Sequence, residues 1–319
     1  MVTYQNTLYE LASADPRIVV LTTESPAAIR ATRQRFCSRF IDVGICEQTI
    51  IGVAAGLALR GRIPVVHAAA AFLTTRAFEF IRTDVGIACL PVKLIGAMAG
   101  FLSEANGPTH QAVEDLALMR GIHGMQVICP ADEIELAMAL PAVIDSPLPC
   151  YVRHTSAAAK VNHTQPFEFG HAERLRDGDD VAILTYGLLV GEAMEAAHML
   201  ASAGIETRVV NLRTLVPFDV AEVEDARRRS RLVVTLEDHF QVGGLYSILA
   251  EHLLRHGETS RVLPMALEGR WFRPALLPDV LELENLAAAW IATRIQHALG
   301  RTPASGHHRS QSFEGAAFV

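Results

Sequence analysis

The clearest indication of the fold is the sequence Asp42-Val43-Gly44-Ile45-Cys46-Glu47-Gln48, followed by TIIGVAAGLALRG to residue 61. The run FIDVGI at 40–45 predicts a short strand, and residues 46–61 predict a helix whose small side chains allow close packing. Glu47 then lies in the first turn of that helix, beside the carboxyl end of the strand, where α/β sheets bind their ligands. A glutamate there also interacts favourably with the helix dipole, and this stretch alone leaves both roles open.

The same alternation of strand and helix runs through most of the chain. Short apolar runs at 64–68, 92–98, 126–130 and 150–153 are separated by amphipathic stretches. This pattern indicates βαβ units and a mostly parallel sheet.

A polar segment, residues 156–178, interrupts the pattern and predicts a linker. Strand and helix signals resume at residue 179 and continue to residue 300. A chain of 319 residues, at about 150 residues per domain, accommodates two domains. We therefore expect two doubly wound α/β domains, over 1–155 and 179–300, and a flexible tail over 301–319, which has no periodicity.

The charge balance and the lack of long apolar runs exclude several classes of protein. Lys and Arg total 28 against 35 Asp and Glu, whereas nucleic-acid-binding proteins usually carry a basic excess. No apolar run approaches the roughly 18 residues of a membrane span, and the N-terminus lacks the features of a signal peptide. We expect a cytoplasmic protein with neither nucleic acid nor membrane as partner. The five cysteines include no C-x-x-C pair, so no disulfide framework or metal site is predicted.

Familiar catalytic signatures are absent from the sequence. There is no G-x-G-x-x-G opening a helix, no G-x-x-x-x-G-K-[ST] phosphate loop, no G-x-S-x-G elbow and no H-E-x-x-H. A dehydrogenase, a kinase, a serine hydrolase or a zinc protease would each lack its usual motif. The pattern is that of an enzyme fold without a complete set of active-site motifs.

Two further segments place polar side chains where strands of the first domain end. Gly107-Pro108-Thr109-His110-Gln111 is a turn that brings His110 to the same edge as Glu47. Cys150-Tyr151-Val152-Arg153-His154 is a short strand that ends in a basic pair. A loop histidine is often structural, and an arginine at a strand end either binds an anion or pairs with an acid. The residues alone do not decide between these roles.

Together and in this order, the segments resemble the pyrimidine-binding domain of transketolases and deoxyxylulose-phosphate synthases. The resemblance rests on DVGICEQ, IIGVAAGLALRG, AFLTTRAFEF, GPTHQAVEDLALMRGI and VICPADEIE. It continues in the second domain with VVTLEDHFQVGGLYSILAEHL. The resemblance covers about residues 1–300 and implies a thiamine-diphosphate pyrimidine-binding domain followed by a transketolase C-terminal-like domain.

The resemblance also implies a partner. Full-length transketolases have an additional N-terminal domain whose G-D-G…N motif holds magnesium and the diphosphate of thiamine diphosphate. The only similar string here, Asp177-Gly178-Asp179, lies just before the second domain. We therefore expect the second subunit of a split transketolase, inactive alone, which joins an N-terminal transketolase subunit in an α2β2 assembly; that partner would hold the magnesium and the diphosphate.

The roles of four residues follow from the resemblance. Glu47 matches the catalytic glutamate that hydrogen-bonds N1′ of the cofactor's aminopyrimidine. Phe72 matches the aromatic residue that stacks on the pyrimidine, and Phe78 is a weaker candidate for the same pocket, with a core position as its alternative. His110 matches a histidine that contacts substrate oxygens and assists proton transfer.

The substrate side shows one match and one departure. Arg153 matches a position that binds the phosphate of a sugar phosphate, where a guanidinium suits a dianion. Asn106 stands where the family usually has an aspartate directly before G-P-T-H, so a neutral amide would meet the substrate hydroxyl. We expect transfer of a two-carbon ketol unit from a ketose phosphate to an aldehyde, with a sugar stereochemistry or donor that differs from the usual one.

Two alternatives belong to other functional classes. The β subunit of a 2-oxo acid dehydrogenase, or of a related decarboxylating ligase, shares the fold and the glutamate. The G-P-T-H-Q motif argues against the dehydrogenase, and Arg153 argues for a phosphorylated sugar. The second alternative is an inactive scaffolding paralogue, against which the joint presence of Glu47, Phe72 and His110 argues.

Overall fold

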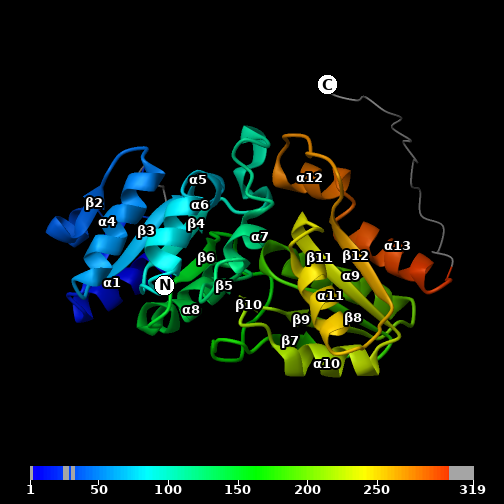
Figure 1. The fold of residues 1–319 in the computed structure, drawn as a ribbon. Coiled ribbons are helices and arrows are strands. Elements are labelled where there is room, and N and C mark those ends of the chain that lie inside the picture. Colours follow the sequence, from blue (N-terminus) through cyan, green and yellow to red (C-terminus); the bar gives the residue numbers. More distant parts are fainter. Residues whose placement is uncertain (1–2, 24–28, 30–32, 302–319) are drawn as a thin grey trace.

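The strands form two separate sheets in the computed structural model, which describes residues 3–23, 29 and 33–301 (Figure 1). The first sheet has the order β10-β5-β6-β4-β3-β1-β2. Its strands are β1 (Ile18–Thr22), β2 (Phe40–Asp42), β3 (Ile63–Ala69), β4 (Lys93–Ala97), β5 (Gln126–Ile128), β6 (Cys150–His154) and β10 (Thr214–Val216). The second sheet has the order β12-β11-β8-β9-β7. Its strands are β7 (Glu173–Arg176), β8 (Val181–Thr185), β9 (Thr207–Asn211), β11 (Leu232–Phe240) and β12 (Val262–Leu267).

Both sheets are parallel except at one edge. β10 runs antiparallel to β5, and β7 runs antiparallel to β9. Strands β1, β4, β6, β8 and β9 are buried along their whole length, as expected for parallel strands covered on both faces. The predicted pair of α/β domains is confirmed.

The boundary between the domains differs from the expected one in two places. Residues 173–176, expected in the linker, form β7 and belong to the second sheet. Strand β10 lies within the expected second domain, yet it extends the first sheet beside β5. The chain therefore crosses between the domains more than once, and the expected tail lies almost entirely outside the described residues.

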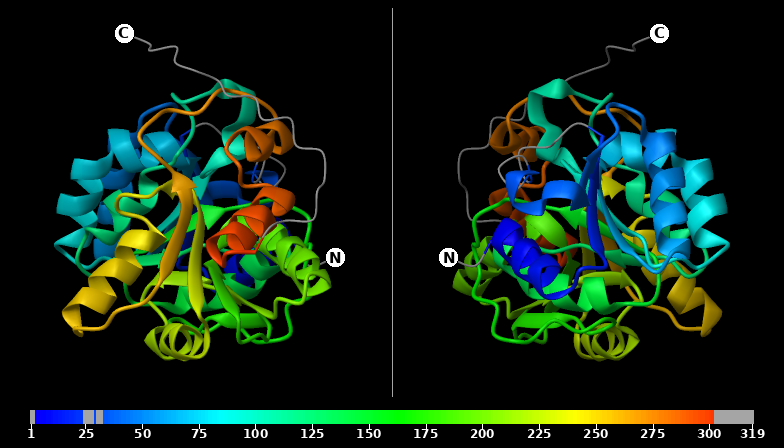
Figure 2. Two further views of the ribbon diagram at one scale, coloured as in Figure 1. Left: turned by 90° about the vertical axis from the view of Figure 1, so that its right-hand side faces the viewer. Right: turned by 90° about the vertical axis from the view of Figure 1, so that its left-hand side faces the viewer.

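Helices cover both faces of each sheet (Figures 1 and 2). In the first domain α1 (Tyr4–Ala14) and α8 (Glu133–Asp145) pack on one face of the sheet, because Leu8 and Leu140 share a core with Val20. The other face is covered by α4 (Glu47–Leu59), α5 (Ala70–Arg76), α6 (Phe78–Phe80), the π-helical turn η2 (Ile81–Gly86) and α7 (Asp115–Arg120). The first domain also contains α3 (Arg33–Phe36) and two 3-10 segments, η1 (Cys37–Arg39) and η3 (Phe101–Asn106).

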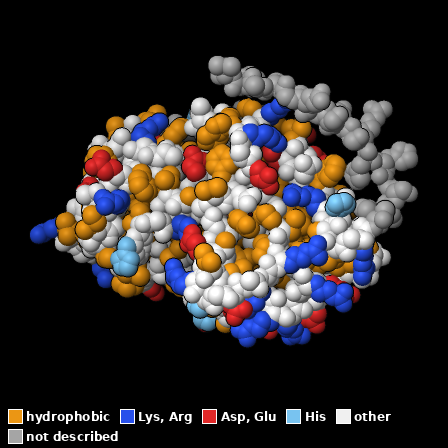
Figure 3. All heavy atoms as spheres, turned by 45° about the vertical axis from the view of Figure 1, so that its right-hand side comes forward, with side chains coloured by type: hydrophobic (Ala, Val, Ile, Leu, Met, Phe, Trp, Pro, Cys, Tyr) orange, Lys and Arg blue, Asp and Glu red, His pale blue; other side chains and the backbone are white. Residues whose placement is uncertain are grey.

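Helices also cover both faces of the second sheet. They are η4 (Gly187–Leu189), α9 (Val190–Ser202), α10 (Val220–Arg229), α11 (Leu245–Arg255), α12 (Leu277–Leu283) and α13 (Ala288–Ala298). On the face in Figure 3, acidic and basic side chains alternate along the lower edge, where α10 lies. Their charges are paired, for example Glu224 with Arg227 and Arg228. None of the helices in the described ranges has the length and apolar character needed to cross a bilayer.

The two domains share hydrophobic core. The cluster on the α4 side of the first sheet extends to Leu184 of β8, Val210 of β9 and Leu249 of α11. A second cluster joins Phe101 of η3 to Phe272, whose rings meet edge to face at 4.8 Å between centroids. Since burial of apolar surface holds the domains together, the second domain also fixes the position of η3 and of the turn that carries His110.

Candidate active site

Glu47 opens α4 at the carboxyl edge of the first sheet, and its side chain is only 2% exposed. The carboxylate oxygen Oε2 accepts a hydrogen bond from Arg76 Nη1 at 2.8 Å. The other oxygen, Oε1, receives no hydrogen bond from any residue in the described part of the chain. Oε1 is not among the fully enclosed unpaired atoms of the described residues, so it remains open on the solvent side, where a hydrogen-bond donor of a ligand could reach it.

Arg76 connects Glu47 to the aromatic part of the site. It is the last residue of α5, which follows directly on β3. Its guanidinium carbon lies 4.3 Å from the centre of the Phe72 ring, a cation–π distance. Residues four apart share one face of a helix, so the spacing of Phe72 and Arg76 within α5 produces this contact.

Phe72 in turn contacts His110. The two ring centroids are 4.9 Å apart at an interplanar angle of 68°, and His110 Nδ1 lies 2.9 Å from the Thr109 hydroxyl. Phe72 rests on a cluster of small side chains, Ala70, Ala71, Ala99 and Ala112. We refer to Glu47, Arg76, Phe72 and His110 as the active-site string, because each contacts the next. Three of its four members are residues that the sequence predicted for the site.

The turn before His110 is held against the second domain at both ends of η3. Gly107 has φ +77°, and a Cβ on it would meet Pro274 Cγ at 2.8 Å. Gly100 has φ +59°, and a Cβ there would overlap the Asp238 carboxylate. Glycine is needed at both positions, for conformation and for space. Asn106, the other predicted substrate contact, is exposed at the end of η3.

Arg153 lies in β6, the strand on which the sequence placed it, and its guanidinium is bonded to acids, one of the two roles that the sequence left open. Nε and Nη2 donate to the two Asp115 oxygens at 2.9 and 3.0 Å, and Nη1 donates to Asp238 Oδ1 at 2.5 Å. The side chain is 6% exposed. We call Arg153, Asp115 and Asp238 the interdomain knot, since Asp115 opens α7 and Asp238 belongs to β11. The prediction that Arg153 binds a substrate phosphate is therefore replaced by a structural role between the domains.

Phe78 also departs from its predicted place. It is the first residue of α6 and packs, half-buried, against the core between the sheet and α4. Phe72 belongs to the separate alanine cluster beside His110. The structure thus favours the core position, which was the alternative for Phe78.

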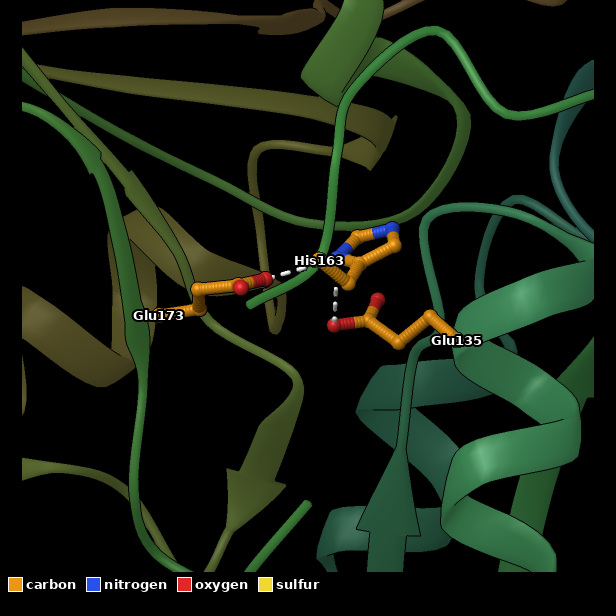
Figure 4. A group of neighbouring side chains, drawn as sticks. All are labelled: Glu135, His163 and Glu173. Atoms are coloured by element: carbon orange, nitrogen blue, oxygen red, sulfur yellow. Dashed lines mark hydrogen bonds and ion pairs between the residues drawn. The ribbon is translucent and has the colours of Figure 1, made fainter. Parts of the chain in front are cut away.

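A third polar cluster joins the linker to both domains. His163 Nδ1 lies 2.6 Å from Glu173 Oε2 of β7, and its Nε2 lies 2.8 Å from Asp132 Oδ2 at the start of α8. Glu135 of α8 approaches the same ring, with Oε1 3.6 Å from Nδ1 (Figure 4). We call His163, Asp132, Glu135 and Glu173 the linker joint.

The linker joint has the spacing of a metal site but behaves as an ion-pair cluster. Glu135, His163 and Glu173 offer ligand atoms within 4.8 Å of one another. Burial disfavours the imidazolium, but the hydrogen bonds to Asp132 and Glu173 outweigh burial and raise the pKa of His163 to about 10. At neutral pH the imidazolium therefore supplies a positive charge beside the Asp132 and Glu173 carboxylates.

The motifs of the sequence indicated neither Arg76, Asp115 and Asp238 nor any member of the linker joint. Arg76 lies within the quoted AFLTTRAFEF motif, and its spacing of four from Phe72 on a predicted helix was an available signal. Asp115 and Asp238 gave no comparable signal, because their pairing with Arg153 spans 38 and 85 residues.

Comparison with known proteins agrees with this architecture. Residues 2–160 match the family described as "Transketolase, pyrimidine binding domain", and residues 170–286 match "Transketolase, C-terminal domain". The chain is 40% identical over 255 residues to 6-deoxy-6-sulfo-D-fructose transketolase subunit SqwH of Clostridium sp. (strain MSTE9), covering 79% of each chain.

Two further relatives show how the chain relates to longer and split enzymes. It is 35% identical over 310 residues to the 1-deoxy-D-xylulose-5-phosphate synthase of Gloeobacter violaceus, covering 95% of this chain but 48% of that enzyme. The chain thus spans about half the length of that relative. A solved structure titled "Split gene transketolase, inactive beta4 tetramer" superposes with a TM-score of 0.85 at 34% identity, covering 93% of this chain and 97% of the other. The protein belongs to the transketolase family, of which it contains the pyrimidine-binding and C-terminal domains.

Proposed function

We propose that this chain is the pyrimidine-binding subunit of a thiamine-diphosphate-dependent transketolase that is active only with a partner subunit. The observation that carries the proposal is the Glu47 carboxylate, which is buried, is bonded through Oε2 alone within the described residues, and lies in one string with the Phe72 and His110 rings. A hydrogen-bond acceptor beside an aromatic ring fits the edge and face of an aminopyrimidine. The reaction is transfer of a two-carbon ketol unit from a ketose phosphate to an aldehyde.

The residues present fit the cofactor, and each has a distinct task. Thiamine diphosphate supplies the nucleophilic carbon that cleaves the bond next to a ketose carbonyl. Glu47 holds a proton between its free Oε1 and N1′ of the pyrimidine, while Phe72 packs on the ring and excludes water. His110 transfers protons at the substrate oxygens. Asn106, exposed at the end of η3, donates or accepts at a sugar hydroxyl.

The partner completes the site in this proposal. An N-terminal transketolase subunit would hold magnesium and the diphosphate, and two copies of each chain would form an α2β2 complex. Support comes from SqwH, which is named as a subunit, and from the split-gene relative, whose β4 tetramer is titled inactive. We expect this chain alone to be inactive, because its sequence lacks the G-D-G…N motif that would hold the magnesium and the diphosphate.

The substrate carries a charged group in this proposal, but Arg153 does not bind it. The guanidinium of Arg153 already donates hydrogen bonds to Asp115 and Asp238. Other residues of the complex would therefore bind the charged group of the substrate. The name of SqwH specifies a sulfonated ketose. Trials of donors should therefore include both ketose phosphates and 6-deoxy-6-sulfo-D-fructose.

The deciding experiment uses the complex as it would assemble. The chain is co-expressed with an N-terminal transketolase subunit from the same organism, and native mass spectrometry is run with thiamine diphosphate and magnesium. We expect a heterotetramer with two cofactors that transfers ketol units, and no turnover by this chain alone. Turnover by the isolated chain would disprove the split enzyme. A complex that binds no cofactor would favour the scaffold, and release of CO₂ from a 2-oxo acid would favour the decarboxylating alternative.

A further inference from the structure

We propose that Arg76 is a positioning residue that selects which oxygen of Glu47 meets the cofactor. This inference rests on the proposed function. Arg76 Nη1 donates to Oε2 at 2.8 Å, which leaves Oε1 as the oxygen available to the pyrimidine. Glu47 and Arg76 lie 29 residues apart and are brought together by the packing of α4 against α5.

Arg76 is itself held in place, so it can act as a fixed reference point. Its guanidinium lies over the Phe72 ring of the same helix at 4.3 Å. The helix is in turn fixed by its direct continuation from β3 and by the buried alanines below Phe72. Arg76 is 41% exposed, so its guanidinium is positioned by the contacts with Phe72 and Glu47 and not by burial. A planar group with a fixed fork of donors orients a carboxylate more strictly than an ammonium does.

A glutamate in the first turn of a helix needs such an anchor. Its side chain has several rotatable bonds, and either carboxylate oxygen could otherwise turn toward the pyrimidine or away from it. Proton sharing with N1′ requires one oxygen within hydrogen-bond reach, and small misplacements of a reacting group cost large factors in rate. Arg76 removes this freedom without contacting the reacting atoms.

The contact with Phe72 extends the effect along the string. Loss of the guanidinium frees the Phe72 ring, which packs against His110 at 4.9 Å. The consequences should therefore fall on cofactor affinity and on kcat, because both depend on the pyrimidine pocket. The KM for the sugar should change little, since Asn106 and the turn before His110 are held against the second domain at Gly107.

The test compares Arg76→Gln and Arg76→Lys in the co-purified complex, with Arg82→Gln as control. Arg82 is an exposed arginine six residues further along the chain, in η2. Cofactor dissociation constants come from titration calorimetry, and the circular dichroism bands of the bound aminopyrimidine report its tautomer. For Arg76→Gln we expect roughly 10-fold weaker cofactor binding and a kcat lower by about 10- to 100-fold. The KM should stay within about twofold, and Arg76→Lys should recover part of kcat.

A double-mutant cycle with Glu47→Ala, measured beside Glu47→Gln, distinguishes positioning from direct binding, because alanine cannot accept a hydrogen bond from Arg76. If Arg76 acts through Glu47, then Arg76→Gln weakens cofactor binding by less than about twofold when Glu47 is already replaced. An equal loss of affinity in both backgrounds would mean that Arg76 binds the cofactor itself, and the inference would be wrong. It would also be wrong if Arg76→Gln behaved like Arg82→Gln.

The same data separate this inference from the proposed function. A wild-type complex that binds no cofactor, or full turnover by Glu47→Gln, overturns the proposed function. Loss of turnover in Glu47→Gln together with unchanged Arg76→Gln overturns only the inference on Arg76. Melting curves for each complex show whether a variant is folded. If Arg76→Gln does not fold, Arg76→Lys provides the test in its place.

Discussion

The active-site string and the interdomain knot both contain an arginine that bonds a carboxylate near the carboxyl edge of the first sheet. In the knot the Arg153 guanidinium meets two aspartates and is 6% exposed. In the string Arg76 meets one oxygen of one glutamate and is 41% exposed. The knot thus has its hydrogen-bonding capacity filled by the fold, whereas the string keeps an acceptor and an aromatic face for something outside the chain. The active-site string therefore differs from the interdomain knot less in residue type than in having a hydrogen-bond acceptor and an aromatic face left available for a ligand.

The largest expected effect is on activity at the string. Glu47→Gln removes the group that shares a proton with the cofactor, so kcat of the complex should fall by about 10²- to 10⁴-fold. The free energy of unfolding should change by less than about 1 kcal/mol, because Gln keeps the shape and can still accept from Arg76. Steady-state kinetics and urea unfolding measure the two effects. A large loss of stability with little loss of activity would reverse the roles assigned to the two regions.

The next effect is on stability at the knot. Arg153→Met leaves the buried Asp115 and Asp238 carboxylates without their cation, which should lower the free energy of unfolding by about 3–5 kcal/mol. The matched control is Arg76→Met, where the half-exposed ion pair is expected to contribute about 0–1 kcal/mol. Both are measured by urea unfolding at one protein concentration. An equal loss of unfolding free energy in Arg153→Met and Arg76→Met would contradict the view that only Arg153 has a structural role.

The linker joint should show a pH dependence of its own. The pKa of His163 is raised to about 10 by Asp132 and Glu173, above its ordinary value near 6.5. Its stabilising contribution is therefore complete below about pH 6.5 and is lost as the pH rises through about 10. His163→Gln should cost roughly 2 kcal/mol at pH 7 through the lost charged hydrogen bonds, and the difference from wild type should shrink as the pH rises from 7 to 10. A difference that is constant from pH 7 to 11 would contradict the charged histidine.

The smallest expected effect concerns the turn before His110. Gly107→Ala meets both a φ of +77° and Pro274 Cγ at 2.8 Å, whereas Gly61→Ala meets the same φ with nothing within 4 Å. Each should lose about 1 kcal/mol from the backbone conformation. Gly107→Ala should lose about 1 kcal/mol more from the contact with Pro274, and kcat should fall with it. Equal melting temperatures for the two variants would show that Pro274 yields to the added methyl group.

The fold was predictable because its signals are local. Each parallel strand of the first sheet is a short apolar run, and the helices between the strands have their own periodicity, so the two α/β domains could be expected from the sequence. Strand β10 could not, since its three residues pair with β5 some 90 positions earlier. The same applies to β7, a polar edge strand that reads as linker.

The site was predictable in part for a related reason. Glu47, Phe72 and His110 each stand in a motif that can be recognised within its own segment, and the structure brings them together with Arg76. Phe78 shares the motif of Phe72, but packing sends it to the core instead. Whether an aromatic side chain faces a pocket or a core depends on the neighbouring elements, and the motif carries no information on them.

The family, the two-domain α/β fold and the residues at the sheet edge can be inferred from the sequence alone. Which of the two arginines is available cannot, because it depends on packing: Arg153 is enclosed by aspartates from two domains, and Arg76 is half-exposed beside Glu47. The physical reason is that an ion pair depends on distances of a few ångströms between atoms far apart along the chain. Residue type states what charge a side chain can carry, while the packed fold determines whether that charge is already paired.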